Sequence, residues 1–288
     1  MTYSLYPGCT VRSTGAECAA SVRAVFDALG IGLVELPDWN CCGASSARIV
    51  DRDLGVLLPG RNLLIAQQLG MGMVATCAGC HSRLRYAQQR LLESKGLRDR
   101  LSSTVGIPWE GGAVTESPLS VVAGLDPAEI GSRVKLSLQA LKVAPYYGCL
   151  LARPRRETGE KDPDNPTSMD LVLSLLGAEI VDWSYKTDCC GGSLALSCRE
   201  VARRLANRLA KKAVEAGARC IVTACPTCQA NLEMRQSGRD RLPVFYFTEL
   251  MGLSFGLDGI GSWWIGHLIN PLTLFQSVGL AEACGVHG

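Results

Sequence analysis

Short apolar runs alternate with longer amphipathic stretches along the first half of the chain. The runs are bounded by Gly, Pro or polar residues, which is typical of buried strands. Strands are predicted at Thr2–Tyr6, Leu33–Leu36 and Met73–Ala75. Helices are predicted at Ser21–Leu29, Leu54–Leu69 and His81–Leu92. Gly30 and Gly70 directly follow the first two helices, where glycine commonly ends a helix.

The second half repeats this alternation. Its predicted elements are Val143–Tyr147, Met169–Leu176, Glu179–Trp183, Val201–Ala216 and Cys220–Thr223, followed by a strand in "PVFYF" and a helix in "TELMGLSFGL". Strands that alternate with helices form parallel sheets with right-handed crossovers. We therefore predict an α/β protein with two similar halves.

A stretch rich in Gly, Pro and Ser, "TVGIPWEGGAVTESPLS", lies between the halves. Two helices are predicted after it, in "SPLSVVAGL" and in "DPAEIGSRVKLSLQAL", where Asp126 is the expected N-cap and Pro127 the first helical residue. We expect a first domain at 1–95, a connecting segment at 96–142, and a second domain with a C-terminal extension at 143–288.

Ten of the fourteen cysteines form two matching sets. The first has the spacing C-x31-CC-x34-C-x2-C and the second C-x39-CC-x34-C-x2-C. Their members are Cys9, Cys41, Cys42, Cys77 and Cys80, and then Cys149, Cys189, Cys190, Cys225 and Cys228. The flanks repeat as well: "SLYPGC" parallels "PYYGC", "CCGAS" parallels "CCGGS", and "VATCAGC" parallels "VTACPTC". An internal duplication is the simplest interpretation.

The cysteines lie where predicted strands end and helices begin. Ligands of open α/β sheets gather at the carboxyl ends of the strands, and helix N-termini there favour thiolates. We therefore expect the five cysteines of each half to share one pocket.

Five cysteines in each half exceed the four ligands that a structural zinc uses. Adjacent cysteines point apart in an extended chain, so they reach different metal atoms more readily than the same one. A cluster with several irons accepts thiolates from several directions. These patterns favour iron–sulfur ligation, with zinc and metal-free dithiol redox chemistry as the alternatives.

The doubled motif resembles the cysteine-rich CCG domain, and the chain is similar to the B subunit of heterodisulfide reductase over nearly its whole length. "DPDNPTSMDLVLSLLGAEIVDWSYKTDCCGG", "CPTCQANLE" and "FYFTELMGL" carry this resemblance beyond the cysteines. The resemblance implies two Rossmann-like domains. It also implies two noncubane [4Fe-4S] clusters that all ten cysteines ligate. A disulfide would be cleaved between the clusters, with Cys41, Cys42, Cys189 and Cys190 acting through them.

The resemblance also bears on substrate and partners. Methanogenic relatives carry a histidine after the cysteine that matches Cys149, whereas Leu150 stands here. This difference argues against the coenzyme M–coenzyme B heterodisulfide and favours the bacterial sulfur-oxidising type, which uses lipoate-bound sulfur. The sequence has no G-x-G-x-x-G motif and no P-loop, so electrons are expected from two partners that the resemblance implies, a ferredoxin-like C subunit and, through it, a flavoprotein A subunit.

Two other roles fit the same cysteines. One is an electron-relay subunit of a dehydrogenase complex without its own substrate site. The other is a zinc-stapled scaffold that organises partners.

Composition narrows the functional class. The net charge of +2 gives no support for nucleic-acid binding. The start "MTYSLYPGC" lacks the pattern of a secretory signal, and no apolar run is long enough for a spanning helix, so we expect a cytoplasmic protein.

Further residues have a functional and a simpler interpretation. Arg153, with Arg155 and Arg156, is either an electrostatic element for an anionic substrate or part of a solvated face. Lys186 is a candidate hydrogen-bond donor near the second cluster. His81 is either a proton donor beside the first cluster or, in the favoured interpretation, a surface histidine. Trp263 and Trp264 are expected in the core or at a partner surface rather than at a membrane. Cys18, Cys198 and Cys220 are expected as buried apolar residues, and Cys284 as a free thiol.

Overall fold

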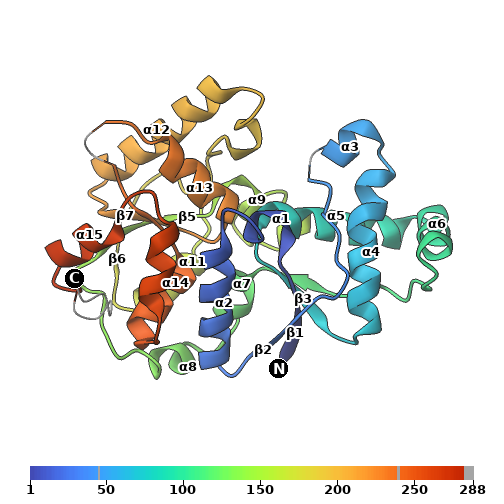
Figure 1. Cartoon of the computed structure of the whole chain (residues 1–288), viewed down its shortest axis with the longest axis horizontal. Coiled ribbons are helices and arrows are strands. Elements are labelled where there is room, and N and C mark those ends of the chain that lie inside the picture. Colours follow the sequence, from blue (N-terminus) through green and yellow to red (C-terminus); the bar gives the residue numbers. More distant parts are fainter. Residues whose placement is uncertain (45, 239–240, 282–288) are drawn as a thin grey trace.

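Each half of the chain builds its own four-stranded parallel sheet in the computed structural model, which describes residues 1–44, 46–238 and 241–281 (Figure 1). The first sheet has the order β2-β1-β3-β4, from β1 (Thr2–Tyr6), β2 (Gly32–Glu35), β3 (Gly72–Ala75) and β4 (Thr115–Glu116). The second has the order β6-β5-β7-β8, from β5 (Lys142–Tyr146), β6 (Glu179–Ile180), β7 (Cys220–Thr223) and β8 (Val244–Tyr246). The predicted α/β fold with two equivalent parallel sheets is confirmed.

Helices connect the strands in both halves. Those before the second sheet are α1 (Gly8–Val11), α2 (Ala16–Ala28), α3 (Ser46–Val50), α4 (Leu54–Gln68), α5 (Ala78–Glu93), α6 (Lys95–Val105), α7 (Pro118–Ala123) and α8 (Pro127–Gly131). Those that follow are α9 (Gly148–Ala152), α10 (Arg155–Thr158), α11 (Ser168–Leu175), α12 (Arg199–Glu215), α13 (Pro226–Arg235), α14 (Phe247–Phe255) and α15 (Pro271–Ser277). Two short 3₁₀ helices complete the set, η1 (Gly192–Leu194) and η2 (Ile260–Gly266).

The segment at 96–142 differs from its expected description in two respects. It contributes β4, which pairs with β3 and adds a fourth strand to the first sheet. The helix predicted over 126–141 begins as expected, with Asp126 as the N-cap, but it ends at Gly131. Beyond it, the amides of Lys135 and Leu136 both donate to the carbonyl of Ser254, each at 2.9 Å. The backbone thus bonds to α14 instead of continuing the helix, so the longer prediction was wrong.

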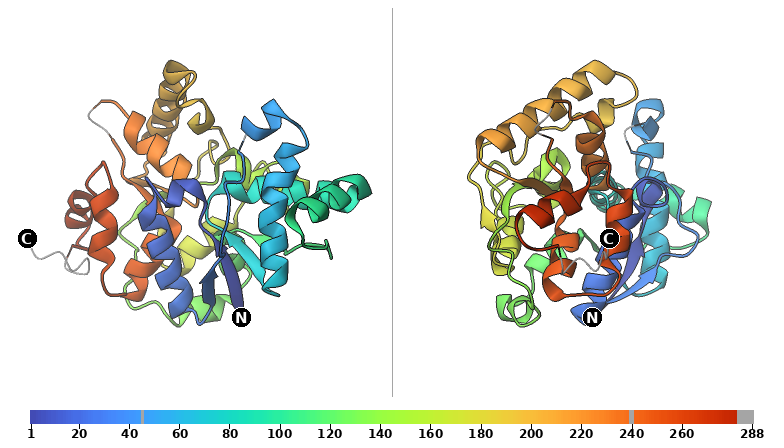
Figure 2. Two further views of the ribbon diagram at one scale, coloured as in Figure 1. Left: turned by 45° about the vertical axis from the view of Figure 1, so that its right-hand side comes forward. Right: turned by 60° about the vertical axis from the view of Figure 1, so that its left-hand side comes forward.

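The two halves are held together by packing between distant segments. Helix α2 of the first half lies against α14 and η2 of the second half (Figures 1 and 2). Inside this contact, the hydroxyl groups of Ser21 and Thr248 lie 2.7 Å apart and buried. Because this hydrogen bond is buried, it is stronger than an exposed one and fixes how α2 and α14 align.

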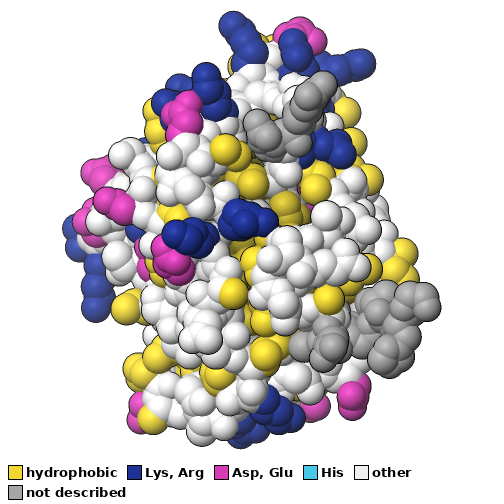
Figure 3. Space-filling view, turned by 90° about the vertical axis from the view of Figure 1, so that its left-hand side faces the viewer, with side chains coloured by type: hydrophobic (Ala, Val, Ile, Leu, Met, Phe, Trp, Pro, Cys, Tyr) yellow, Lys and Arg dark blue, Asp and Glu magenta, His cyan; other side chains and the backbone are white. Residues whose placement is uncertain are grey.

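Both tryptophans of the C-terminal segment belong to the core. Trp263 and Trp264 are buried, and the ring of Trp264 packs edge-on against Phe245 and Phe275. Their expected placement in the core is confirmed. On the face drawn in Figure 3, which includes the C-terminal side, basic and acidic side chains lie among uncharged and hydrophobic ones.

Candidate metal centres

The cysteines of each half gather at the carboxyl end of its sheet. In the first half, the Sγ atoms of Cys42 and Cys80 lie 3.4 Å apart. The thiol of Cys41 interacts with those of Cys9 and Cys42, and that of Cys77 with Cys80. These interactions link all five thiols of the first half.

The second half repeats these contacts at equivalent positions. The Sγ atoms of Cys190 and Cys228 lie 3.6 Å apart. Cys189 interacts with Cys149, and Cys225 with Cys228. In both halves the second cysteine of the adjacent pair thus meets the last cysteine of the CxxC motif, in the first turn of a helix.

Two buried tyrosines hold the adjacent pairs in place. Tyr6, at the end of β1, donates its hydroxyl to the carbonyl of Asn40 at 2.9 Å. Tyr146, at the end of β5, donates to the carbonyl of Asp188 at 2.6 Å. Each acceptor directly precedes its cysteine pair. Our sequence interpretation did not assign these tyrosines a role, although each stands three residues before the first cysteine of its repeat.

A glycine directly precedes the first cysteine of each set and lies close to the sulfur of the last one. Gly8 has a φ of +71°, and a Cβ atom there would lie 3.0 Å from the Sγ of Cys80. Gly148 has a φ of +66°, and its Cβ would lie 3.4 Å from the Sγ of Cys228. A larger residue would strain the backbone at both positions, and at Gly8 it would also crowd the sulfur of Cys80.

Several thiols in these groups ionise readily. The hydrogen bond with Cys80 lowers the pKa of Cys42 to about 7, despite the opposing effect of burial. The hydrogen bond with Cys149 lowers the pKa of Cys189 to about 6. Amides assist, since Gly191 donates to the Sγ of Cys189 and Gly192 to that of Cys190, each at 3.3 Å. The same hydrogen bonds raise the pKa of the partner thiols of Cys80 and Cys149, so one thiol of each pair ionises before the other. Sulfur donors suit a soft metal, and its binding would release the protons that remain.

The CxxC motifs of the two halves meet at the N-termini of α5 and α13, where Cys77 and Cys225 are the N-cap residues. The Sγ of Cys77 lies 3.8 Å from the Oγ1 of Thr227, and the hydrogen bond between the thiols of Cys77 and Cys225 lowers the pKa of Cys77. Leu150 lies at the same contact, because a Cβ at Gly79 would stand 3.7 Å from Cys77 Sγ and 3.8 Å from Leu150 Cδ1. The two sulfur groups are therefore neighbours.

Within the residues that the structure describes, no three His, Cys, Asp or Glu side chains are placed as ligands of a single metal ion.

The other candidate residues lie around these groups in different environments. His81 follows Cys80 but is buried, so the favoured surface interpretation was wrong. Burial, and then the charge of Arg85, lower its pKa to about 4. The imidazole packs inward because it stands on the first turn of α5, which faces the core.

Lys186 and Arg153 are engaged in ion pairs. The ammonium group of Lys186 is buried and pairs with Asp170, while its carbonyl accepts hydrogen bonds from the amides of Tyr147 and Gly148. Arg153 is half exposed and pairs with Asp164 on the surface. Lys186 therefore supports the turn that leads to Cys149 through its backbone.

The cysteines outside the two sets are dispersed. Cys18 and Cys220 are buried, as expected. Cys198 is exposed at the N-terminus of α12, so its predicted burial was wrong, since the chain there is a surface turn. Cys284 lies outside the described residues.

The fold and the paired sulfur groups define a duplicated cysteine-rich α/β protein. The Cysteine-rich domain family, CCG, matches the chain twice, at residues 3–85 and 143–233. The chain belongs to this family, which confirms the resemblance inferred from the cysteine spacing.

Several relatives share most of the chain. It is 32% identical over 265 residues to the 8-methylmenaquinol:fumarate reductase membrane anchor subunit of Wolinella succinogenes, covering 88% of this chain and 92% of that protein. It is 28% identical to the B subunit of the ferredoxin/F420H2-dependent CoB-CoM heterodisulfide reductase of Methanosarcina acetivorans, covering 88% and 89%. It is 26% identical to a protein of Archaeoglobus profundus named as similar to the heterodisulfide reductase B subunit, covering 89% and 91%.

The fold also occurs in a solved structure. A hypothetical protein from Helicobacter pylori matches with a TM-score of 0.75 at 10% identity, covering 92% of this chain and 51% of that one. Among the described residues, no helix combines the length and the apolar character needed to cross a membrane.

Proposed function

We propose that this chain is an iron–sulfur subunit of a multisubunit oxidoreductase, with one multi-iron centre in each repeat. The observation that carries the proposal is the contact between the second cysteine of the adjacent pair and the last cysteine of the CxxC motif, at 3.4 Å in one half and 3.6 Å in the other. One structural zinc takes four ligands, whereas a cluster with several irons accepts thiolates from several directions, so five thiols in each set favour a multi-iron centre.

The ligands of the proposed centres are the ten cysteines of the two motifs. Following the family resemblance, each set of five would hold a noncubane [4Fe-4S] cluster. When bound, such a cluster supplies a one-electron redox centre. The chain itself supplies the thiolates. It also supplies the two tyrosine clamps, the hydrogen bonds from Tyr6 to Asn40 and from Tyr146 to Asp188, and the glycines that leave room for the sulfur atoms.

Iron and acid-labile sulfide analysis of the anaerobically purified protein tests this proposal. Two four-iron centres give about eight irons per chain. A content of two zinc ions and no iron would refute an iron–sulfur function. It would instead favour the zinc-stapled scaffold.

We further propose that electrons pass between the two centres within this chain. The contact of Cys77 with Thr227 and Cys225 brings ligands of both proposed centres together at the boundary between the halves. The relative named as the membrane anchor subunit of a fumarate reductase is similar over 92% of its length, which supports a place in a reductase complex.

A second candidate is two-electron disulfide or thiol chemistry at the same contact, in a heterodisulfide reductase-like complex. The relatives named for the B subunit of heterodisulfide reductase favour it. Two one-electron centres that face one S–S bond match the two electrons that its reduction requires. Ferredoxin-like and flavoprotein subunits would be the partners, and lipoate-bound sulfur the substrate class.

Electron paramagnetic resonance separates the two roles. Addition of a thiol to the oxidised protein should change the cluster signals if a cluster binds sulfur. In an electron-relay subunit the cluster signals should stay unchanged, because the clusters do not bind the thiol.

A further inference from the structure

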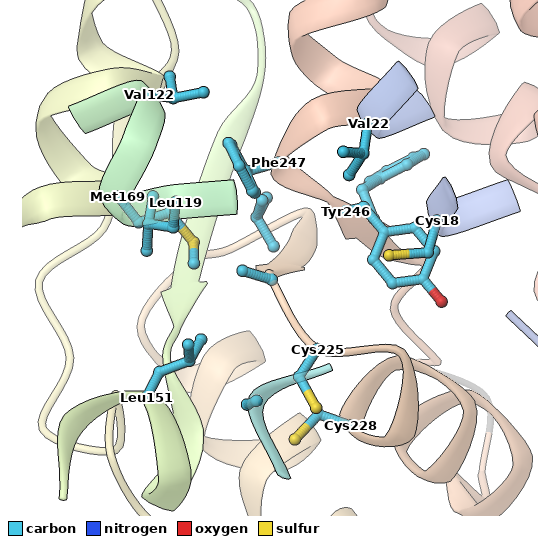
Figure 4. Close-up of a cluster of buried hydrophobic side chains, with 14 of the residues drawn as sticks. Cys18, Val22, Leu119, Val122, Leu151, Met169, Cys225, Cys228, Tyr246 and Phe247 are labelled. Carbon is cyan, nitrogen blue, oxygen red and sulfur yellow. The ribbon is translucent and has the colours of Figure 1, made fainter. Parts of the chain in front are cut away.

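The cysteines of the second set differ in their exposure to solvent. Cys190, Cys225 and Cys228 are buried, Cys149 is half-buried and Cys189 is exposed. Figure 4 shows Cys225 and Cys228 side by side among buried apolar side chains. A protein that approaches the second proposed centre from outside therefore comes closest to it at the adjacent pair.

The segment that follows this pair is held firmly but carries an exposed leucine. The guanidinium group of Arg235 donates to the carbonyl of Ala195 at 2.9 Å, and the side chain of Asn231 donates to the carbonyl of Cys190 at 2.8 Å. Both bonds tie the segment to α13. Leu196 is nevertheless 97% exposed. An aliphatic side chain on a fixed backbone is suited to a protein contact, because binding orders little that was mobile before.

Helix α12 begins directly after this segment and has a basic face. Its exposed cations are Arg199, Arg203, Arg204, Arg208 and Lys211. Seven basic and two acidic residues lie between positions 199 and 219, a net charge of +5, whereas the whole chain carries +2, so the remaining residues carry −3. The basic face reaches the second centre, since Arg208 pairs with Asp188, the residue before Cys189.

Part of this charge is not neutralised within the protein. Arg203 pairs with Glu200, and Lys211 lies 3.8 Å from Glu215. In the part of the chain that the structure describes, Arg199 and Arg204 have no such partner. These two cations stand at the end of α12 that follows Leu196.

The first repeat shows that the fold does not require these charges. Helix α4 follows the first cysteine pair as α12 follows the second, yet Arg61 is its one charged residue, whereas α12 has eight. Helix α4 packs against α5 and α6, while α12 packs against α13 and lies at the edge of the molecule (Figures 1 and 2). The same architecture thus forms with and without a basic face, which points to a role of that face in binding.

We propose that the basic face of α12, with Leu196 at its N-terminal end, docks an acidic electron-carrying protein beside Cys189. The redox character of this partner rests on the proposed function, whereas its acidity rests on the charge of α12. An apolar contact with charges around it is common in protein interfaces, and opposite charges steer the partner into place. A membrane surface fits less well, because the apolar side of α12, with Ala206 and Leu209, is buried within the protein and does not enter a bilayer.

Biolayer interferometry on the immobilised, anaerobically purified protein tests this proposal with two redox proteins of opposite charge. The probes are a plant-type [2Fe-2S] ferredoxin, which is acidic, and cytochrome c, which is basic. The ferredoxin should bind and cytochrome c should not. Raising the salt from about 20 to about 300 mM should weaken ferredoxin binding at least tenfold, because exposed charges are screened.

Two pairs of variants locate the contact. Arg204→Glu should weaken ferredoxin binding at least fivefold at low salt. Lys135→Glu makes the same charge change at an exposed residue beyond α8, at the opposite end of the molecule from α12 in Figure 1, and should change binding less than twofold. Leu196→Ala should weaken binding about threefold at both salt concentrations. Leu92→Ala, at a leucine that is 58% exposed on α5, is its control and should have no effect.

Several results would overturn the docking face. They are a failure of the ferredoxin to bind, equal binding of both probes, and an equal effect of Arg204→Glu and Lys135→Glu. Binding of phosphatidylglycerol vesicles that Arg204→Glu abolishes, without binding of the ferredoxin, would assign the face to a membrane instead. Iron content measured before the probe is added separates the two proposals. Protein without iron that still binds the ferredoxin refutes the proposed function alone, and iron-loaded protein that does not bind it refutes the docking face alone.

Discussion

The Sγ of Cys77 lies 3.8 Å from the Oγ1 of Thr227, across the boundary between the two repeats. A residue of the second repeat therefore helps to set the environment of a sulfur atom in the first. Hydrogen bonds to ligand sulfurs are among the factors that set the reduction potential of a cluster.

Replacing Thr227 by Val should make the potential of the first centre more negative, because a donor to Cys77 is lost. A hydrogen bond of about 1 kcal/mol corresponds to about 40 mV for one electron. A redox titration followed by electron paramagnetic resonance measures the shift. Thr104→Val, on exposed α6, is the control, and equal potentials in all three proteins would contradict the prediction.

Each repeat should hold its own centre. Cys42→Ser should lower the iron content by about half, and Cys190→Ser should remove the other half, since each of these sulfurs contacts the last cysteine of its own set. Cys198→Ser, at an exposed cysteine outside both sets, should keep the full content. Loss of all iron in either single variant would show that the centres assemble as one.

Gly8 and Gly30 allow a controlled test of whether the close approach of Gly8 to a sulfur atom matters for metal binding. Both have a φ of +71°, but a Cβ at Gly8 would lie 3.0 Å from Cys80 Sγ, whereas one at Gly30 meets no described atom within 4 Å. Alanine at either position should cost about 1 kcal/mol of unfolding free energy through backbone strain. Only Gly8→Ala should also lower the iron content, so equal iron in both variants would contradict the steric role.

The tyrosine clamps should slow the loss of metal. Tyr6→Phe removes the hydroxyl that holds the carbonyl of Asn40 and should cost about 1 kcal/mol. Faster iron release to a chelator is expected, because the turn before Cys41 loosens. Tyr3→Phe, in the same strand, removes an exposed hydroxyl that donates to Met1 and should release iron at the parental rate.

His267 should make stability depend on pH. Burial alone would lower its pKa, but the charge of Glu249 and hydrogen bonds to Glu233 and Glu249 outweigh burial and raise the pKa to about 10. A folded-state pKa above the unfolded value of about 6.5 stabilises the protein below that value, and this contribution is lost as the pH rises toward 10.

Urea unfolding between pH 6.5 and 9.5 measures this loss. His267→Gln should be destabilised by about 3 kcal/mol at pH 6.5, since two buried carboxylates lose their cation. The difference in unfolding free energy between the variant and the parent protein should become smaller as the pH rises. A gap that is constant across this range would contradict the raised pKa.

The sequence predicted what depends on local pattern and on repetition. Strands such as β7 (Cys220–Thr223) were found within their bounds, because an apolar run between polar turns has few other solutions. The convergence of each cysteine set followed from its place after successive strands. The repeat itself predicted that both halves would be built alike.

What the sequence did not reveal depends on contacts between distant segments. The helix from Asp126 stops at Gly131 because Lys135 and Leu136 bond to Ser254, more than a hundred residues away. His81 is polar and follows a cysteine, yet the core around α5 encloses it. The hydrogen bond from Tyr6 to Asn40 joins residues on either side of a strand–helix–strand crossover, so local pattern did not predict it. The tyrosine that recurs three residues before the first cysteine of each set could have indicated it.

The packing of α2 against α14 and η2 has a consequence for how such a protein can change over evolutionary time. A duplicated gene normally frees one copy to drift, but here the hydroxyls of Ser21 and Thr248 and the helices around them tie each copy to its sibling. A change that moves α2 would also change the surface against which α14 and η2 pack. The duplication is thereby locked into a single inherited unit.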